Sequence, residues 1–224
     1  IDSNRSDFTM VECTIVDNVA NRRGGIQLNE STMVMRDSAV LGNRADQSGA
    51  GIGAYLSDAT FERVTFENNR AISHGGGALD VLGGTVHATD LRMVRNTGIR
   101  AGGLYAQGAA SVTGSGWWVE GNQAGQLGGG INLSESTASL SNVGLHRNAP
   151  GAIYLYGGSD FELENFTVTG NTSDSLSVIC ADGAGTLALR QGTLVGNQTG
   201  AIYGHGDELE LTNLLVHENG TTYG

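Results

Sequence analysis

An asparagine recurs along the whole chain at intervals of 22 to 27 residues, and in every case an apolar residue stands three positions before it. Self-similarity at a period of roughly 20 to 50 residues is typical of solenoids, propellers and other repeat folds. The repeat therefore constrains the fold more than any other feature of the sequence. The asparagines that fit this pattern are Asn18, Asn43, Asn69, Asn96, Asn122, Asn148, Asn171, Asn197 and Asn219.

Each repeat holds three short stretches in which apolar and polar residues alternate. The first ends eight residues before the asparagine, as with Phe8 and Met10. The second ends three residues before it, as with Val64 and Phe66, and the third follows the loop after the asparagine, beginning for example at Ile26. Because alternate residues of a strand face the same side, each stretch predicts a short strand with its apolar side inward.

Stacking of these repeats predicts an all-β fold in which residues 1–224 form a single right-handed parallel β-helix segment, with an expected count of about nine coils and three short strands per coil. Neighbouring coils would pair in register at about 4.8 Å. No segment shows the period of an amphipathic helix, and the 36 glycines oppose one. A two-layer β-sandwich is the alternative, but it does not predict a repeat of fixed length.

The asparagine and the glycines that follow it have a structural explanation in such a fold. Identical residues of successive coils lie above one another, so we expect the asparagine amides to form a hydrogen-bonded ladder along the axis. Asparagine also tolerates left-handed backbone geometry at a tight corner. The paired glycines before the third strand, such as Gly24 and Gly25, would let the chain re-enter the wall at a corner too crowded for a Cβ.

Two motifs resemble those of a known family. Phe66-Glu67-Asn68-Asn69 and Gly76-Gly77-Ala78-Leu79, with weaker copies along the chain, resemble the FxxN and GGA(I/L/V) motifs of chlamydial polymorphic outer membrane protein repeats and of autotransporter-type β-helix passengers. The chain departs from the chlamydial pattern in having phenylalanine at one of its nine asparagine motifs. The resemblance implies a β-helix that is secreted or displayed on a bacterial surface. Adhesins, structural proteins and pectin-lyase-like enzymes share this architecture.

The charge and the ends of the chain bear on its partners. The formal net charge is −11, which argues against a nucleic-acid partner, and no apolar run reaches the roughly 20 residues needed to insert into a membrane. Ile1 stands at a third-strand position and the last residues fall within a loop. We therefore expect a segment cut in mid-coil at both ends from a longer protein, with flanking β-helix coils of the same chain as neighbours.

The outward side of the third strands offers the first candidate binding residues. Tyr105, Tyr154 and Tyr203 fall on alternate coils, about 10 Å apart, and aromatic faces at such intervals suit the sugar rings of an extended glycan. Asp80 lies in the same column. The alternative is that tyrosine is simply a favourable residue on an exposed β surface.

The closest arrangement to a catalytic site is Tyr156, Asp182 and His205, which occupy successive coils, so that Asp182 could orient the histidine. Such trios also arise by accident on any stacked surface. Gly204-His205-Gly206 resembles one motif of polygalacturonases, but the other marks of that family are missing. The outward columns hold only two carboxylates, four coils apart, whereas glycoside hydrolysis needs a close pair. We predict no metal site and no cofactor.

Arginines and a tryptophan complete the candidates. The loops after the asparagines present arginines that would either receive an acidic or sulfated glycan or pair with nearby carboxylates at a solvated rim: Arg22, Arg23, Arg44, Arg70 and Arg100. Trp117 and Trp118 are adjacent, so one must face inward beside Gly114 and the other, expected to be Trp118, outward.

These patterns favour a non-catalytic segment of an extracellular or cell-surface β-helix, acting as a rigid stalk or an adhesive passenger that contacts glycans or other molecules of a host or cell surface. The alternative is a carbohydrate-active enzyme of pectin-lyase-like fold that uses the third-strand face.

Overall fold

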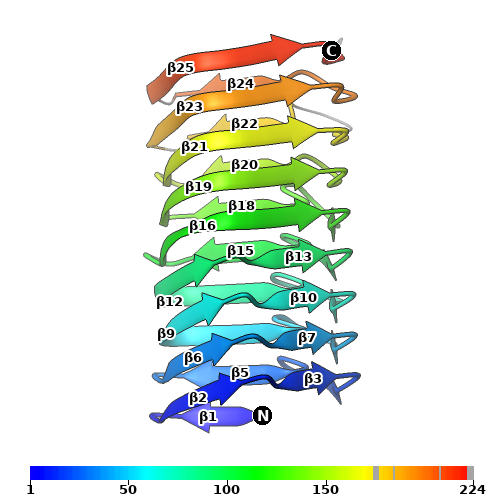
Figure 1. Ribbon diagram of the computed structural model, residues 1–224, viewed down its shortest axis with the longest axis vertical. Helices are drawn as coiled ribbons and strands as arrows, with labels where there is room; N and C mark the ends of the chain where they lie inside the picture. Colours follow the sequence, from blue (N-terminus) through cyan, green and yellow to red (C-terminus); the bar gives the residue numbers. More distant parts are fainter. Residues whose placement is uncertain (174–176, 184, 207, 221–224) are drawn as a thin grey trace.

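The computed structural model describes residues 1–173, 177–183, 185–206 and 208–220, and shows an all-β parallel solenoid of about eight turns (Figure 1). In Figure 1 the chain crosses the near face from left to right, returns across the far face from right to left and rises from the N-terminus to the C-terminus, which is a right-handed winding. The predicted β-helix is confirmed. Its count is nearer eight turns than nine, because nine stacked asparagines enclose eight full turns.

Three strand positions recur in each coil, as expected. The far face carries the third-strand position: β1 (Asp2–Asn4), β5 (Ile26–Asn29), β15 (Leu104–Gln107), β18 (Ile131–Ser134), β20 (Ile153–Tyr156), β22 (Ile179–Asp182) and β24 (Ile202–His205). The near face carries the first-strand position, at β2 (Asp7–Val11) and β6 (Thr32–Arg36), and the second-strand position, at β3 (Thr14–Val16), β7 (Ala39–Leu41), β10 (Thr65–Glu67) and β13 (Arg92–Val94).

Neighbouring strand positions merge in several coils. The third and first positions are continuous in β9 (Ile52–Glu62) and β12 (Leu79–Thr89). The first and second are continuous in β16 (Ser111–Glu120), β19 (Thr137–His146), β21 (Asp160–Thr169), β23 (Thr186–Val195) and β25 (Glu208–His217). The pairings are parallel and keep the repeat in register, so that Phe66 lies between Val40 and Met93 of the adjacent coils.

Among the described residues, a fourth, two-residue strand follows the asparagine in five coils and forms a small separate sheet. Its members are β4 (Val19–Ala20), β8 (Arg44–Ala45), β11 (Arg70–Ala71), β14 (Thr97–Gly98) and β17 (Gln123–Ala124). Sequence analysis missed this sheet because two residues cannot show an alternating pattern. No helix long and apolar enough to cross a membrane occurs in the part of the chain that the structure describes.

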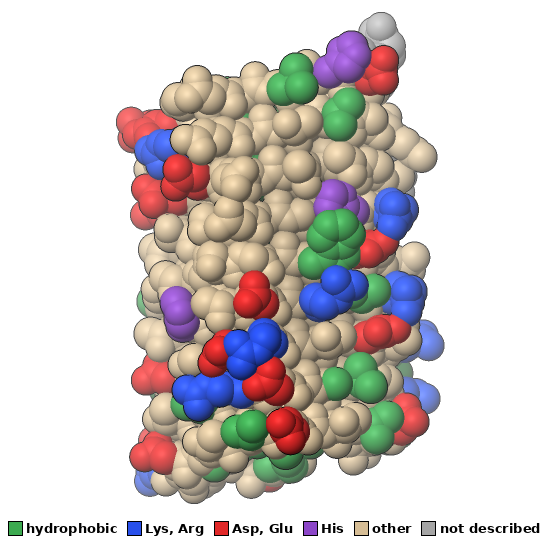
Figure 2. Space-filling view, in the orientation of Figure 1, with side chains coloured by type: hydrophobic (Ala, Val, Ile, Leu, Met, Phe, Trp, Pro, Cys, Tyr) green, Lys and Arg blue, Asp and Glu red, His purple; other side chains and the backbone are tan. Residues whose placement is uncertain are grey.

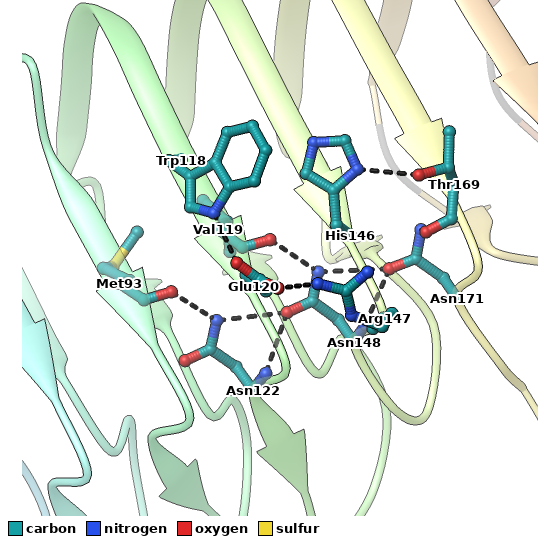
Figure 3. A network of polar contacts seen from close by, with 10 residues as sticks. All are labelled: Met93, Trp118, Val119, Glu120, Asn122, His146, Arg147, Asn148, Thr169 and Asn171. Atoms are coloured by element: carbon teal, nitrogen blue, oxygen red, sulfur yellow. Dashed lines mark hydrogen bonds and ion pairs between the residues drawn. The ribbon is translucent and has the colours of Figure 1, made fainter.

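The asparagine ladder is continuous. From Asn43 to Asn197, the side-chain amide of each asparagine donates to Oδ1 of the next, as from Asn122 to Asn148 at 3.1 Å, and also to a carbonyl of the preceding coil, that of Met93 at 2.8 Å for Asn122 (Figure 3). The backbone N–H of Asn122 donates to the same Oδ1 of Asn148 at 3.0 Å. The seven asparagines from Asn43 to Asn197 are at most 2% exposed, so the ladder satisfies polar groups inside the core.

The left-handed corners lie beside the ladder rather than on it. The residue directly before each ladder asparagine has a positive φ, as at Asp17, Asn68 and Arg95, and a second such corner lies six residues before the asparagine, as at Arg63 and Asp90. The expectation that the asparagine itself adopts the left-handed conformation is therefore wrong. Its value lies in the side-chain amide, which can both donate and accept.

The glycines before the third strand mark the crowded corner that the sequence predicted. A Cβ on Gly51 would lie 2.4 Å from the carbonyl oxygen of Ala78 in the next coil, and one on Gly103 would lie 2.4 Å from that of Gly130. Trp117 is 1% exposed and fills the core beside Gly114, donating its indole N–H to the carbonyl of Ala88 at 2.9 Å. Trp118 faces outward, as predicted, and is 37% exposed.

Candidate functional site

The near face carries an aromatic pair that register places side by side. Trp118 on β16 lies opposite Gly144 of β19, and His146 lies opposite Glu120. The rings of Trp118 and His146 are 4.3 Å apart between centroids and inclined at 39°. A Cβ on Gly144 would lie 2.5 Å from Nε2 of His146 and 3.2 Å from Cε3 of Trp118. The glycine therefore leaves the space in which the two rings meet.

Polar contacts hold both rings in place. The indole N–H of Trp118 donates to Glu120 at 2.6 Å, and Glu120 is also bound by Arg147 (Figure 3). Nδ1 of His146 lies 2.7 Å from the Thr169 hydroxyl. Burial lowers the pKa of His146, which favours the neutral ring at neutral pH. Nε2 of His146 is buried and has no hydrogen-bond partner among the described residues.

A groove of about 390 Å³ adjoins this pair. Gly144 and Trp118 line it together with the polar side chains of Asn142, Asn165 and Thr167. Two further hollows in the same coils, of about 420 and 210 Å³, share Ser139 and Glu162. Figure 2 shows that charged side chains gather over the lower half and the edges of this face, leaving its upper centre to uncharged groups.

The guanidinium of Arg92 lies 5.9 Å from the Trp118 ring centroid, at the side away from His146 along the axis. Trp118 is thus bracketed by a cation and a neutral imidazole. We call Trp118, His146, Gly144, Asn142 and Asn165 the aromatic site. Sequence analysis selected Trp118 but missed His146, although a shift of one repeat from Glu120 leads directly to it.

The far-face tyrosines are not a row of exposed rings. Tyr105 is only 5% exposed, and its hydroxyl lies 3.1 Å from that of Tyr156, two coils further along. Tyr154 packs on Tyr156 with centroids 5.5 Å apart. Tyr203 is 38% exposed. The expectation of three ring faces standing out on alternate coils is therefore wrong for Tyr105, which is buried with its hydroxyl bound to Gln107 and Tyr156.

Loop carbonyls bind the residue next to Tyr105 in this column. The amide of Asn132, between Tyr105 and Tyr154 in the same column, donates to the carbonyls of Arg100 and Leu127 at 2.8 and 3.2 Å. Asn132 is 2% exposed. The pKa of Tyr105 is raised, first by burial and then by its hydrogen bond with Tyr156. Strand alternation alone does not reveal such loop contacts.

Asp182 and His205 are brought together as predicted. Nδ1 of His205 lies 3.3 Å from Oδ1 of Asp182, with both side chains well exposed. Tyr156 pairs with Asp182 in the register of β20 and β22. No group of three or more His, Cys, Asp or Glu side chains placed to hold a metal was found in the described residues.

Asp80, like Tyr105, is nearly buried, with 8% of its surface exposed. Burial raises its pKa from an ordinary 3.8 to about 6, opposed in part by the Ser48 hydroxyl, Arg23 and His74. Its Oδ1 has no hydrogen-bond partner in the part of the chain that the structure covers. Among the rim arginines, Arg44 pairs with Asp46 at 3.5 Å, whereas Glu67 pairs with Arg95.

Comparison with known proteins adds nothing to this geometry, since no family model, no curated protein and no solved structure matches the chain.

Proposed function

We propose that this chain is a rigid, non-catalytic segment of a β-helical protein displayed outside the cell, and that it contacts glycans through the aromatic site. The observation that carries the glycan contact is the Trp118 ring, which is 37% exposed, lies against His146 and lines a groove that has both apolar and polar side chains. The motif resemblance to bacterial surface repeats supports the placement outside the cell, and the continuous ladder supports the role of a stalk or adhesive passenger.

The chemistry of the aromatic site fits a sugar. A pyranose presents an apolar face that packs on an indole ring and hydroxyls that need donors and acceptors at its edge. The side-chain amides of Asn142 and Asn165 offer both. The adjoining hollows give an extended chain further surface along the strands.

Binding of immobilised oligosaccharides to the purified chain tests the proposal. Trp118→Ala should lower the affinity at least tenfold, because it removes the ring face, while Trp118→Phe should retain most of it. Gly144→Ala should also weaken binding by separating the two rings. The matched control is Tyr203→Ala, an exposed far-face aromatic. Equal loss with the control, or no retention of any glycan, would contradict the proposal.

Placement outside the cell has its own test. Antibodies raised against the purified chain should label intact cells of the source organism or detect the protein in the culture medium. Labelling only after the cells are broken would contradict this part of the proposal and leave the glycan contact to be judged by the binding experiment.

A carbohydrate-active enzyme is the second candidate, favoured by the 3.3 Å contact of Asp182 with His205. It requires turnover of a polysaccharide that falls at least a hundredfold in both Asp182→Asn and His205→Gln. Release of sugar ends by the wild-type chain but equally by both variants would point to a contaminant. No release would leave the non-catalytic proposal standing.

A further inference from the structure

We infer that a second site, on the far face near the N-terminal end, binds an anionic sugar through its carboxylate or sulfate group. The site is a polar cleft of about 300 Å³ lined by Arg22, Arg23, Gln27, Asn29, Gln47 and Ser48. It lies on other coils than the aromatic site, so it does not depend on the proposed function.

A glycine creates the space for this cleft. Gly53 lies between Gln27 and Asp80 in the outward column of the third strands. A Cβ at Gly53 would lie 2.4 Å from Cγ and Cδ of Arg23. The arginine stem therefore crosses the sheet over this glycine, which a side chain at the same position would prevent.

The amide oxygens around the cleft are occupied by guanidinium groups. Nη1 of Arg23 donates to Oδ1 of Asn29 at 3.0 Å, and Nε of Arg22 donates to Oε1 of Gln47 at 2.9 Å. These bonds fix two guanidiniums beside one cleft and leave their remaining N–H groups as donors. Guanidinium forks match the geometry of carboxylate and sulfate oxygens. Gln27 and Ser48 add neutral polar groups suited to sugar hydroxyls.

Asp80 provides an independent indication that this region serves a ligand. A Cβ on Gly75 would lie 2.4 Å from Oδ2 of Asp80 and 2.6 Å from Cβ of Ser48, so the carboxyl lies directly beside a cleft residue. Asp80 is 8% exposed, with an unpartnered oxygen among the described residues. A buried carboxyl in this condition costs stability, and such groups cluster at functional sites.

Asp80 also sets the pH at which the cleft attracts anions. Its carboxylate acts on Arg23, whose pKa is lowered chiefly by burial and raised by Asp80. The other titratable and charged groups facing this pair are His74, Tyr105, Arg22 and Asp2. When Asp80 takes up a proton, the charge of Arg23 is no longer offset. Anion affinity should therefore rise as the pH falls through about 6.

Calorimetric titration of the purified chain with D-glucuronate, glucose 6-sulfate and glucose tests the inference. The two anionic sugars should bind at least tenfold more tightly than glucose at pH 5. The ratio of their affinities then tells whether a carboxylate or a sulfate ester is preferred, and inorganic sulfate shows what the sugar ring adds. Equal binding of glucose, or none of either anionic sugar, would overturn the inference.

Variants then assign the binding to the cleft. Arg23→Gln should lower the affinity for the anionic sugar at least tenfold, and Gly53→Ala should lower it severalfold without changing any charge, because it displaces the Arg23 stem. Arg70→Gln, an exposed arginine of β11 outside the cleft, is the matched control. Circular dichroism and thermal unfolding verify that each variant is folded. Equal loss in the control would show unspecific attraction and overturn the assignment.

The pH dependence supplies a readout that a structural role for Asp80 would not move. Affinity for the anionic sugar should increase about tenfold from pH 7.5 to pH 5 in the wild type and stay nearly constant in Asp80→Asn. His74→Gln separates the contribution of the neighbouring histidine. A dependence that persists in Asp80→Asn and vanishes in His74→Gln would contradict the role given to Asp80. Trp118→Ala should leave all these values unchanged, which keeps this site distinguishable from the aromatic site.

Discussion

The ladder and the Asp80 region both bury polar side chains, but they do so in opposite ways. Asn122 accepts from the backbone and side chain of Asn96 and donates to Met93 and Asn148, and the same pattern recurs from coil to coil. Asp80 is buried almost as deeply, yet one of its oxygens has no partner among the described residues and its pKa is raised.

This difference distinguishes structural residues from candidate binding residues. A buried polar group whose bonds are all made within the chain stabilises the fold and has nothing left for a ligand. A buried carboxyl with an unmet bond lowers stability, and we infer that Asp80 is present beside Arg23 because it serves binding rather than folding. Repetition of a residue in every coil indicates architecture, whereas a residue that does not recur from coil to coil, like Asp80, is a better candidate for function.

The largest effect is expected from breaking the ladder. Asn122→Ala leaves the N–H of Asn96 and the carbonyl of Met93 without their partners in the core, so it should lower the free energy of unfolding by about 3 to 5 kcal/mol. Urea unfolding measures this loss. Asn18→Ala in the exposed first coil is the matched control and should cost less than about 1 kcal/mol, because water can replace its bonds. A loss of under 1 kcal/mol for both would show that the ladder does not stabilise the core.

The opposite sign is expected at Asp80. Its pKa is higher in the folded chain, so the protonated carboxyl stabilises the fold at low pH and this stabilisation is lost as the pH rises through about 6. Asp80→Asn remains neutral and should raise the free energy of unfolding at pH 7.5 by up to about 3 kcal/mol, with little change at pH 3.5. Unfolding curves at the two pH values measure this, and destabilisation at pH 7.5 would contradict the comparison.

Two glycines allow the packing of the coil corner to be compared with that of the cleft. A Cβ at Gly51 meets the backbone oxygen of Ala78 at 2.4 Å, whereas the three atoms nearest to one at Gly53 all belong to the flexible side chain of Arg23. Gly51→Ala should therefore cost about 1 to 3 kcal/mol, and Gly53→Ala less than about 1 kcal/mol, because a surface side chain can move aside. Thermal unfolding of both variants measures the two losses of stability. Equal losses would show that the cleft is packed as rigidly as the coil corner at Gly51.

The smallest effect is expected at the surface ion pairs. Arg36 and Glu62 lie 2.9 Å apart with both side chains partly exposed, so Arg36→Gln should change stability by at most about 1 kcal/mol. The difference should shrink further in 1 M salt. A loss above 2 kcal/mol that salt does not reduce would mean that the outer charges contribute to the fold as the ladder does.

The sequence predicted the interior of this protein far better than its exterior. The asparagine period, the inward residues of each strand and the crowded glycine corner all depend on neighbours at fixed offsets, so one repeat predicts the next. The left-handed residue that precedes each ladder asparagine was missed. Asp17, Asn68 and Arg95 all occupy this position with a positive φ, but they share no residue type that would reveal it.

The exterior depends on contacts that no repeat encodes. Strand alternation placed Tyr105 outside, but Tyr105 is 5% exposed and the neighbouring Asn132 is bound by loop carbonyls. It selected Trp118 and could not show the ring of His146 lying over Gly144. Arg23 was assigned to a loop rim, and its course over Gly53 follows only from the missing side chain.

Within the described part of the chain, the ladder makes all its hydrogen bonds, whereas the Asp80 carboxyl does not. Nuclear magnetic resonance of the Asp80 carboxyl carbon, recorded while the pH is varied, tests this difference most directly. This account predicts that Asp80 titrates near pH 6, and that saturating anionic sugar moves this titration to higher pH. Titration close to the ordinary value of 3.8, unchanged by the sugar, would contradict it.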